Sequence, residues 1–561
     1  MRLLRVFLVA SFLSLLKLAI AIGIFLYLIY ISPPDIVKPA DFNKISPDLN
    51  NGILIYKNNW LKKSESGIWE LYFEGDAFER GVVTGILTKD LIKIQEEAFI
   101  KEIKRMIPSE SFLSFLKYFV GWFNRKIDEH IIPEFQAEIY GVSLSASEDF
   151  DEVGPAYLRF LNYHAAHDIG HSLQNMGIVG CTSFAAWDSA GENNKMIAGR
   201  NFDFYVGDDF SKEKIVAFCN PSSGYKFAFI TWGGMTGVVS GMNEKGLAIT
   251  LNAAPSEIPS EAKTPVSILA REILQYSKNI EEAVEIAQKR KTFVSESFLI
   301  CSAQDNKAVV IEKNTDTLAV YSTQNDYIVS ANHYQSSLFK NSKVQIENRE
   351  NSSSYYRQKR VEEMIIQKKP LNYIKASEIL RDQKGLNGKD IGMANEKAIN
   401  QLIAHHSVIF IPSELKMWVS TKPYQLGKYV AYDLNRVFKD TLIKNGINDE
   451  LYEDSLTIPA DKFLFTKNYI KFETFRKVKA IITEYAKYPF FTEISPEQID
   501  LFISLNPEYY LTYKIAGDYY LNRNDFKKAM YYFETALEKE VTTDKEVVRI
   551  NQAILKCKQA E

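Results

Sequence analysis

The residues with the clearest chemical potential are Gly180-Cys181-Thr182-Ser183, where a cysteine follows a glycine at the start of an expected strand. A thiol in this position can attack the carbonyl of its own preceding peptide, and glycine places no side chain in the way. Hydrolysis of the resulting thioester leaves Cys181 as a new N-terminus. Its α-amino group, with a reference pKa of about 7.7, can then act as general base for its own thiol. The competing interpretation is a buried apolar cysteine, which is common for this residue type.

Polar motifs follow Cys181 in the chain. Gly199-Arg200-Asn201-Phe202-Asp203 carries a cation and an acid, and Leu251-Asn252-Ala253 carries a carboxamide. Taken alone, Arg200 and Asp203 could form a surface ion pair, and Asn252 could be a turn residue. Their order after Cys181 favours a common site over these separate explanations.

In this order the motifs resemble the acyl-coenzyme A:6-aminopenicillanic acid acyltransferase (isopenicillin-N acyltransferase-like) family of autoproteolytic N-terminal-nucleophile enzymes. They also resemble the wider group of choloylglycine hydrolases and acid ceramidase-type amidases. The resemblance covers roughly residues 68–425. Further elements in family order are the turn Gly241–Leu247, a pro-segment start at Glu74–Gly85, an Asn-His-aromatic element at Ser330–Tyr334, a Ser-x-x-Arg-x-x-Arg helix at Ser354–Arg360 and a late strand at His406–Phe410.

The resemblance implies that the chain is cut between Gly180 and Cys181, and that Cys181 is the nucleophile. Asp203 matches the acid that holds the new α-amino group, so that this base stays aimed at the thiol. Arg200 matches the arginine beside the nucleophile, where a cation favours the thiolate.

The resemblance also implies an oxyanion hole. Asn252 and Asn332 match the residues whose amide groups donate to the developing negative charge. Arg357 matches an arginine that organises these groups by hydrogen bonding. Arg360 is the competing assignment, because the spacing between family elements varies.

Neither a cofactor nor a metal follows from the sequence. The four cysteines show no zinc-type spacing. His164, His167 and His171, with Asp168, would share one helix face and could bind zinc. They precede the cleavage point, where the resembling families need no metal, so polar contacts on a helix surface or in the core are the favoured interpretation. A further alternative is that they tune self-cleavage with pH.

The elements that must position these residues change in character at Cys181. Residues 68–180 begin with a short strand and are then mostly helical, whereas the chain from 181 reads as strands interrupted by helices at Pro265–Ser277 and Ile280–Lys289. A late hairpin is expected at His406–Ile411 and Leu415–Ser420. This order predicts an α+β fold with stacked sheets covered by helices. The resemblance implies an N-terminal-nucleophile αββα four-layer sandwich, with a helical pro-segment at 68–180 and a catalytic domain at 181–440.

Beyond a boundary at Lys439–Pro459, residues 460–561 are expected to form a helical tail. One tetratricopeptide-like pattern is present at Tyr513, Gly517, Tyr520, Ala529, Phe533 and Ala536. A single repeat cannot bury its own faces and must pack on neighbouring helices or on the catalytic body. Ordinary amphipathic helices are the alternative. Such a tail could recruit a protein partner or brace the core.

The N-terminal segment indicates where in the cell the protein is located. Arg2 and Arg5 precede the apolar stretch Val6–Ile31, which is long enough to cross a bilayer, although Lys17 opposes insertion by about 2.5–3.5 kcal/mol. Because no small-x-small cleavage site follows, we expect residues 1–32 to form an uncleaved signal anchor, followed by a linker at 33–67. The positive end would stay in the cytoplasm and the body would lie in the cell envelope, outside the membrane. A cleaved signal peptide, which would give a secreted protein, is the alternative.

With 561 residues, 46% apolar residues, 24% charged residues and a net charge of −3, the chain reads as a folded protein without the basic footprint of a nucleic-acid binder. The family resemblance, together with the N-terminal segment, implies a membrane-anchored amidohydrolase that cleaves a linear, non-peptide C–N bond through a thioester at Cys181. Acyl transfer to an amine is a variant through the same acyl-enzyme. Aromatic richness and the anchor favour a small, acylated, lipid-like amide as substrate.

Two other functions compete with this prediction. A tetratricopeptide interaction protein could be tethered to the membrane and carry a catalytically silent nucleophile domain. The joint presence of Cys181, Arg200, Asp203 and Asn252 argues against it, because a scaffold needs none of them. A papain-like protease would need a downstream histidine in a suitable setting. Only His333, His405 and His406 are available, and the family elements better explain His333 and His406.

Overall fold

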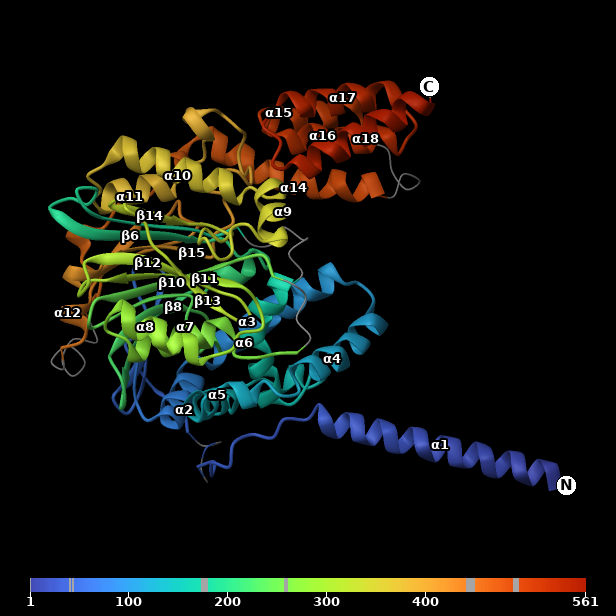
Figure 1. Ribbon diagram of the computed structural model, residues 1–561, viewed down its shortest axis with the longest axis vertical. Coiled ribbons are helices and arrows are strands. Elements are labelled where there is room, and N and C mark those ends of the chain that lie inside the picture. Colours follow the sequence, from blue (N-terminus) through green and yellow to red (C-terminus); the bar gives the residue numbers. More distant parts are fainter. Residues whose placement is uncertain are drawn as a thin grey trace.

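The computed structural model of the protein describes residues 2–39, 42, 45–172, 180–256, 261–439, 449–487 and 494–560. Figure 1 shows a body of stacked sheets and helices, a block of helices at the C-terminal end, and one long helix that projects away near the N-terminus. The fold of the described residues is thus mixed α/β, with large sheets and many helices.

The larger sheet is built from strands on both sides of the expected cleavage point. All of its neighbouring strands pair antiparallel except β4 and β7, which pair parallel. Its order is β1 (Asp48–Asn50), β2 (Ile53–Tyr56), β3 (Asn59–Lys63), β4 (Trp69–Gly75), β7 (Ile215–Pro221), β8 (Phe227–Thr231), β9 (Ser240–Asn243), β10 (Leu247–Ala253), β11 (Glu296–Ser302), β12 (Lys307–Lys313) and β13 (Leu318–Tyr321).

The strand that follows Cys181 belongs to the smaller sheet, where it lies one strand in from the edge. The strands of this sheet are all antiparallel, in the order β14 (Tyr327–Ser330), β5 (Thr182–Asp188), β6 (Asn194–Phe202), β15 (His406–Ile411), β16 (Lys416–Ser420) and β17 (Tyr429–Asp433). The hairpin expected at the late strands is therefore present as β15 and β16.

Helices cover the outer faces of both sheets. In Figure 1, α7 (Val266–Tyr276) and α8 (Ile280–Lys289) lie against the larger sheet, and α10 (Ser354–Lys368) and α11 (Tyr373–Leu380) lie beyond the smaller one. The remaining helices of the body are α2 (Ala77–Leu87), α3 (Lys89–Met106), α4 (Glu110–Asn124), α5 (Pro133–Ser143), α6 (Ala156–Ser172), α9 (Lys343–Asn351) and α12 (Leu434–Val437). The prediction of stacked sheets covered by helices is confirmed.

Side-chain alternation in β5 shows how the layers are joined. Ala185 and Trp187 point into the apolar core between the sheets, where they meet Val216 and Phe218 of β7. Phe184 and its neighbour at 186 point the other way, into the core beneath α10 and α11. Because successive strand residues face opposite sides, one strand serves two cores, and each buried large apolar side chain stabilises the fold by about 1.5–3 kcal/mol.

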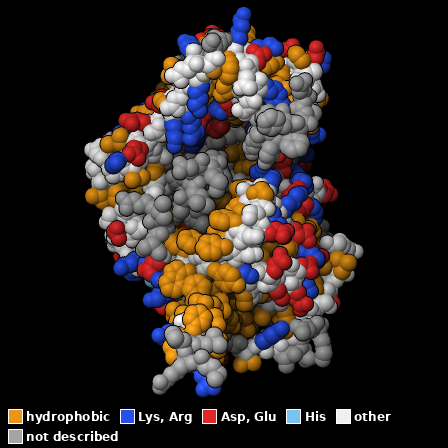
Figure 2. Space-filling model, turned by 90° about the vertical axis from the view of Figure 1, so that its right-hand side faces the viewer, with side chains coloured by type: hydrophobic (Ala, Val, Ile, Leu, Met, Phe, Trp, Pro, Cys, Tyr) orange, Lys and Arg blue, Asp and Glu red, His pale blue; other side chains and the backbone are white. Residues whose placement is uncertain are grey.

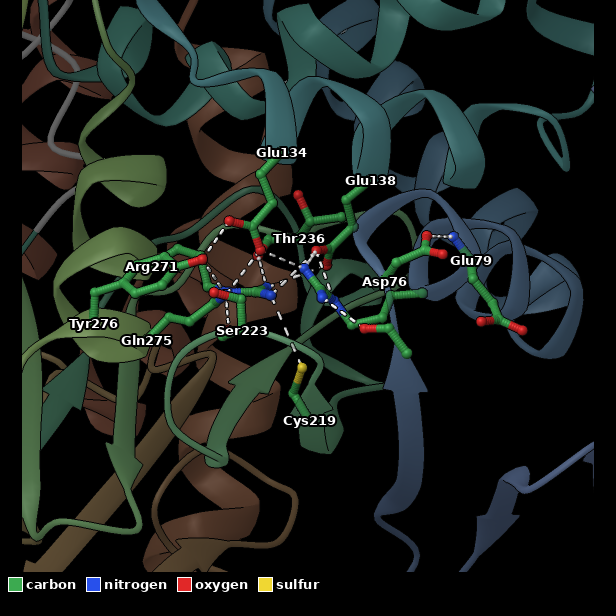
Figure 3. A network of polar contacts seen from close by, with 12 residues as sticks. Asp76, Glu79, Glu134, Glu138, Cys219, Ser223, Thr236, Arg271, Gln275 and Tyr276 are labelled. Carbon is green, nitrogen blue, oxygen red and sulfur yellow. Dashed lines mark hydrogen bonds and ion pairs between the residues drawn. The ribbon is translucent and has the colours of Figure 1, made fainter. Parts of the chain in front are cut away.

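The segment before Cys181 is part of the same body as the segment after it. Besides the β4–β7 pairing, a buried charge network joins α2, α5 and α7 (Figure 3). The Arg80 guanidinium lies 2.7 Å from the Glu138 carboxylate, and Arg271 lies 3.2 Å from the same carboxylate. Burial alone would raise the pKa of Glu138, but the two arginines hold it below its usual value. A cut before Cys181 would therefore divide the chain without separating two structural units.

The expectation of a linker at 33–67 is wrong for residues 48–63. These residues form β1, β2 and β3, the edge of the larger sheet, with Trp60 and Leu61 buried. The apolar run Ile53-Leu54-Ile55-Tyr56 is short, and its strand character depends on pairing with β3. The boundary expected at Lys439–Pro459 lies partly outside the described residues, which omit 440–448.

The C-terminal part is helical, as expected. It comprises α14 (Lys467–Lys487), α15 (Pro496–Leu505), α16 (Tyr510–Leu521), α17 (Phe526–Glu538) and α18 (Asp544–Ala560), which share an apolar core of their own. Within this tail, α16 and α17 approach closely at Gly517, where an added Cβ would lie 2.6 Å from the Phe533 ring. The pattern that suggested a repeat thus reflects the packing of this helix pair, and α14, α15 and α18 supply its neighbours.

The long N-terminal helix α1 (Arg2–Leu28) contains the stretch Arg5–Leu28, the one described helix long and apolar enough to cross a membrane, with a mean hydropathy of 2.3. Its C-terminal end meets α4, where Phe25 stacks on Trp122 with ring centroids 5.6 Å apart. Figure 2 looks onto the side from which α1 projects and shows hydrophobic side chains gathered in the lower part of that face. On α4 the large apolar side chains that are 40% to 64% exposed are Phe112, Phe115, Tyr118, Phe119 and Trp122.

Candidate active site

Cys181 lies immediately before β5, so it enters the smaller sheet between β14 and β6. Its side chain is 1% exposed. The backbone N–H of Gly180 donates to the backbone oxygen of Asp203 (3.0 Å), and Cys181 Sγ lies 3.8 Å from that same oxygen. The expected cleavage point is therefore fixed against the end of β6, the strand that carries Arg200.

Arg200 is buried between the two sheets and faces the thiol. Its Nη2 donates to Cys181 Sγ at 3.7 Å and also to the backbone oxygen of Leu251. Nη1 donates to Ser240 Oγ at 2.6 Å, and Nε donates to Asn252 Oδ1 at 3.4 Å. Because each guanidinium nitrogen has a partner, the cation is held in one orientation beside Cys181.

Burial dominates the protonation of the two titratable groups. It raises the pKa of the Cys181 thiol to about 11, although Arg200 acts in the opposite direction. It also raises the pKa of the Asp203 carboxyl to about 7, against the lowering effect of Arg357 and Arg200. In the uncut chain at neutral pH the thiol is therefore protonated, and the carboxyl is close to half protonated.

The Asp203 carboxyl has an unusual environment. Both of its oxygens are buried, and neither has a hydrogen-bond partner among the described residues. Leaving such a group unpaired is costly, and buried polar groups in native proteins rarely lack a partner. The carboxyl nevertheless interacts electrostatically with Cys181, Arg200 and Arg357. Asp203 thus lies at the centre of the group that the sequence singled out.

Asn252 and Asn332 are oriented in the same way, each by one arginine. Arg200 donates to Oδ1 of Asn252 at 3.4 Å, and Arg357 Nη2 donates to Oδ1 of Asn332 at 2.6 Å. The amide nitrogens then face away from the arginines: that of Asn252 donates to the Ser330 oxygen (2.8 Å) and that of Asn332 to the Ala253 oxygen (2.9 Å). Since an amide carries two N–H groups, each asparagine retains a second donor.

Arg357, rather than Arg360, lies at this site. Its Nε donates to Thr182 Oγ1 (3.2 Å), which places it one residue from Cys181. Arg360 instead pairs with Asp382, with Nε 2.8 Å from the carboxylate. The structure therefore brings together Cys181, Arg200, Asp203, Asn252, Asn332 and Arg357, which the sequence had assigned to one site.

The histidine cluster is not assembled as a metal site in the part of the chain that the structure describes. His164 Nδ1 donates to the Phe160 oxygen (2.7 Å), and its Nε2 accepts the Thr236 backbone N–H (3.0 Å). Burial lowers the pKa of His164 to about 4, so the ring is neutral. Asp168 accepts the Val266 backbone N–H at 2.9 Å. The side chains of His167 and His171 lie outside the described residues, and among the rest no group of three potential ligands could hold a metal.

The sequence reasoning missed three polar residues next to the site. Gln401 Nε2 donates to the backbone oxygen of Gly180 at 2.8 Å. Ser240, which accepts from Arg200, also lies 2.9 Å from Nε2 of His406. His406 begins the late strand noted in the sequence, but no motif marks Ser240 or Gln401, and Gln401 lies 221 positions after Gly180.

A small apolar cavity begins next to the site. Phe204, which follows Asp203 directly, lines it together with Phe210, Trp232 and Phe160. Its volume is about 50 Å³, and Glu96 is the one charged residue among the described residues that line it. The cavity is too small for a drug-sized ligand, for which pockets of roughly 300–1,000 Å³ are usual.

Comparison with known proteins gives a consistent picture. Residues 189–421 match the model of the acyl-coenzyme A:6-aminopenicillanic acid acyl-transferase family. This range contains Arg200, Asp203, Asn252, Asn332 and Arg357 and begins after Cys181. The family resemblance inferred from the sequence is confirmed.

Two curated relatives match part of the chain. The N-acylethanolamine-hydrolyzing acid amidase of Caenorhabditis elegans is 26% identical over 224 residues, which cover 38% of this chain and 59% of the relative. An uncharacterized protein of Archaeoglobus fulgidus is 24% identical over 308 residues, which cover 48% of this chain and 50% of the relative. The chain thus spans between half and three fifths of the length of these relatives.

Solved structures also match. An ortholog of the same amidase from Caenorhabditis elegans is 19% identical, with a TM-score of 0.31, over 42% of this chain and 93% of that structure. A variant of the conjugated bile acid hydrolase of Clostridium perfringens is 14% identical, with a TM-score of 0.33, over 46% of this chain and 93% of that structure.

Proposed function

Because residues 189–421 match the model of the acyl-coenzyme A:6-aminopenicillanic acid acyl-transferase family, we propose that this protein is a self-cleaving N-terminal-nucleophile enzyme that acts on non-peptide amides. One observation carries the proposal: the Cys181 thiol lies 3.7 Å from the Arg200 guanidinium, beside a buried Asp203 carboxyl without a hydrogen-bond partner among the described residues. A merely structural core gains nothing from this arrangement, since an unpaired buried acid is destabilising.

Self-cleavage accounts for the unpaired carboxyl. Cutting the Gly180–Cys181 peptide converts the backbone nitrogen of Cys181 into an α-amine next to Asp203. The N–H groups of this amine can donate to the carboxylate, which gives the buried acid a hydrogen-bond partner and leaves the lone pair of the nitrogen for the thiol proton. The pair would then hold the amine beside its own thiol.

The processed site would work as follows. The neutral α-amine of Cys181 takes the thiol proton, and the thiolate attacks the carbonyl carbon of the amide substrate. The carbonyl oxygen becomes an oxyanion, which the free N–H groups of Asn252 and Asn332 stabilise. Collapse of this intermediate breaks the C–N bond, and the ammonium of Cys181 returns its proton to the departing amine. Water then hydrolyses the thioester at Cys181, or an acceptor amine takes the acyl group.

For the substrate we propose a small acylated amide with an apolar, lipid-like acyl group. The curated relative from Caenorhabditis elegans is an N-acylethanolamine-hydrolyzing acid amidase, and an N-acylethanolamine is an acylated amide. In this chain Phe204, which follows Asp203 in sequence, lines a small apolar cavity together with Phe210 and Trp232. Hydrolysis is the default outcome because water is always available as acceptor.

We further propose that α1 anchors the protein in a membrane, with the catalytic body on the non-cytoplasmic side, and that removal of this helix would release a secreted enzyme. Its length and apolar composition support this assignment. The exposed aromatic face of α4 lies at the end of α1, where Phe25 stacks on Trp122, and aromatic side chains are typical of the membrane–water interface. The other possible role, a tethered interaction protein with a silent nucleophile domain, leaves the unpaired Asp203 carboxyl unexplained.

An intact-mass measurement of the purified chain tests the proposal. We expect two fragments that break between Gly180 and Cys181 and remain associated, because β4 pairs with β7 along seven residues. The Cys181→Ala chain should stay whole and fail to release amine from acyl amides. A wild-type chain that stays whole, or a Cys181→Ala chain that is also cut there, would refute self-processing by this thiol.

A further inference from the structure

Gln401 is placed to act on the scissile peptide itself. Its side chain is 4% exposed, and its Nε2 donates to the carbonyl oxygen of Gly180 at 2.8 Å. That carbonyl carbon is the one that the Cys181 thiol must attack. We propose that Gln401 is the side-chain donor that polarises the scissile carbonyl and stabilises the oxyanion of self-cleavage. This inference rests on the self-cleavage proposed above.

The donors assigned to substrate turnover do not contact this carbonyl. The amide nitrogens of Asn252 and Asn332 donate to the backbone oxygens of Ser330 and Ala253. In the uncut chain the Gly180 oxygen therefore receives its side-chain hydrogen bond from Gln401. The geometry points to two separate donor sets, one for the single self-cleavage event and one for turnover.

Hydrogen bonds of the residues on either side of Gln401 in the sequence hold it in position. Asn201, the neighbour of Arg200 on β6, donates through Nδ2 to the Ile399 oxygen at 3.0 Å. The Asn400 N–H donates to the Asp382 oxygen at 2.8 Å, and Asn400 Oδ1 accepts the backbone N–H of residue 402 at 3.0 Å. The first bond attaches the segment to β6, and the second attaches it to the residues that follow α11. A donor fixed in this way stabilises an oxyanion without reorganisation.

The same contact explains the glycine at position 180. A Cβ on Gly180 would lie 2.4 Å from Gln401 Nε2 and 2.6 Å from its Oε1. The Gln401 amide thus occupies the space in which any other residue at position 180 would carry its side chain.

The step balances without an outside reagent other than water. The Cys181 sulfur forms a bond to the Gly180 carbonyl carbon, and the π electrons move to the oxygen that Gln401 contacts. Re-formation of the carbonyl breaks the C–N bond, and the nitrogen leaves as the α-amine of Cys181 with the proton lost by the thiol. Water then hydrolyses the thioester, which gives a carboxyl group on Gly180 and a free thiol on Cys181.

The test follows cleavage of the full chain with time after its synthesis in a cell-free system with detergent. Gln401→Ala should slow the appearance of the fragments by roughly 100- to 1,000-fold, the usual effect of removing one oxyanion donor. Gln401→Glu, which keeps the size and loses the amide donor, should slow it comparably. Gln425→Ala is the matched control, because Gln425 is also fully buried and donates to the Leu380 oxygen instead. This control should be cut at the wild-type rate.

A second readout separates this role from a general structural one. Gln401→Ala chains that have been cut, quantified by their free N-terminal cysteine, should hydrolyse an acyl amide at the wild-type rate per site. Wild-type cleavage kinetics in Gln401→Ala would overturn the inference, as would equal slowing in Gln425→Ala or a parallel loss of turnover per cut site. If wild type and Cys181→Ala both stay whole, self-cleavage itself is refuted, and the role of Gln401 is refuted with it.

Discussion

Replacement of Gly180 by alanine offers a sharp test, because the structure shows which atoms the new methyl group would meet. The Cβ would lie 2.4 Å from Gln401 Nε2, whereas ordinary contacts of a Cβ are 3.4–4 Å, so the amide must withdraw by about 1 Å. Its hydrogen bond to the Gly180 oxygen, now 2.8 Å, would lengthen beyond the usual limit for such bonds. The φ of Gly180 lies outside the left-handed region, so alanine strains the side-chain contact and not the backbone.

The expected magnitude is that of a lost oxyanion donor. We expect the barrier to self-cleavage to rise by about 2.7–4 kcal/mol, which slows the appearance of fragments by roughly 100- to 1,000-fold. Gly23→Ala is a suitable control, because a Cβ there has no neighbour within 4 Å.

A double-mutant cycle then shows whether the glycine acts through Gln401. With Gln401→Ala the obstructing amide is gone, and the methyl group of Gly180→Ala has room. The double variant should therefore be cut as slowly as Gln401→Ala alone, and the coupling energy should equal the full effect of Gly180→Ala. Additive effects, which would slow cleavage by roughly 10⁴- to 10⁶-fold, would refute this reasoning and indicate direct obstruction of the thiol. Wild-type cleavage of Gly180→Ala would refute it as well.

Other predictions concern turnover, pH and the tail. Asn252→Ala should lower kcat on an acyl amide by about two to three decades in cut enzyme, and a change confined to KM would contradict its assignment as an oxyanion donor. Burial raises the pKa of Asp203 to about 7 in the folded, uncut chain, whereas the same group loses its proton near pH 4 in the unfolded chain. Because the folded state binds this proton more tightly, the free energy of unfolding falls as the pH rises from about 4 to 7. In the Cys181→Ala background, Asp203→Asn should flatten this fall in the thermal unfolding midpoint; parallel curves would be evidence against it. Tyr509→Phe removes bonds of 3.1 Å to the Glu396 carboxylate and should lower kcat by roughly tenfold, while an unchanged kcat would exclude coupling of the tail to the site.

The sequence correctly predicted those features of the fold and site that depend on a single strand or a single motif. The chain from residue 181 was predicted to form strands, and β5 begins there at Thr182, where its apolar residues form a continuous buried run. Arg200 and Asp203 were assigned from their order after Cys181, and β6 brings both to the thiol. The order of the motifs could not exclude Arg360 in place of Arg357, because the assignment depends on which of the two side chains reaches Asn332.

Contacts between distant segments were not predictable in the same way. β1 to β3 lie in a stretch that begins with prolines and polar residues, and their strand character depends on pairing within the larger sheet. Gln401 belongs to no periodic pattern, and its importance follows only from its 2.8 Å contact with Gly180. His164 shows the reverse error: its helical spacing suggested a ligand set, but both of its ring nitrogens are engaged by the surrounding protein.

The helical tail can be understood through the segment that carries Gln401. Residues 389–401 run from the end of α11 toward β15, and two of their groups contact the candidate site. The backbone oxygen of Glu396 accepts from Arg357 at 3.1 Å, and the side chain of Gln401 donates to the backbone oxygen of Gly180. The tail holds this segment through the pairs Asn506–Met393, Tyr509–Glu396, Glu540–Lys389 and Glu540–Lys397. Since a donor must be fixed to within a fraction of an ångström to be effective, a segment without regular structure needs such attachment. In the proposed enzyme, the contacts of the tail with the body would therefore hold the segment that carries Gln401.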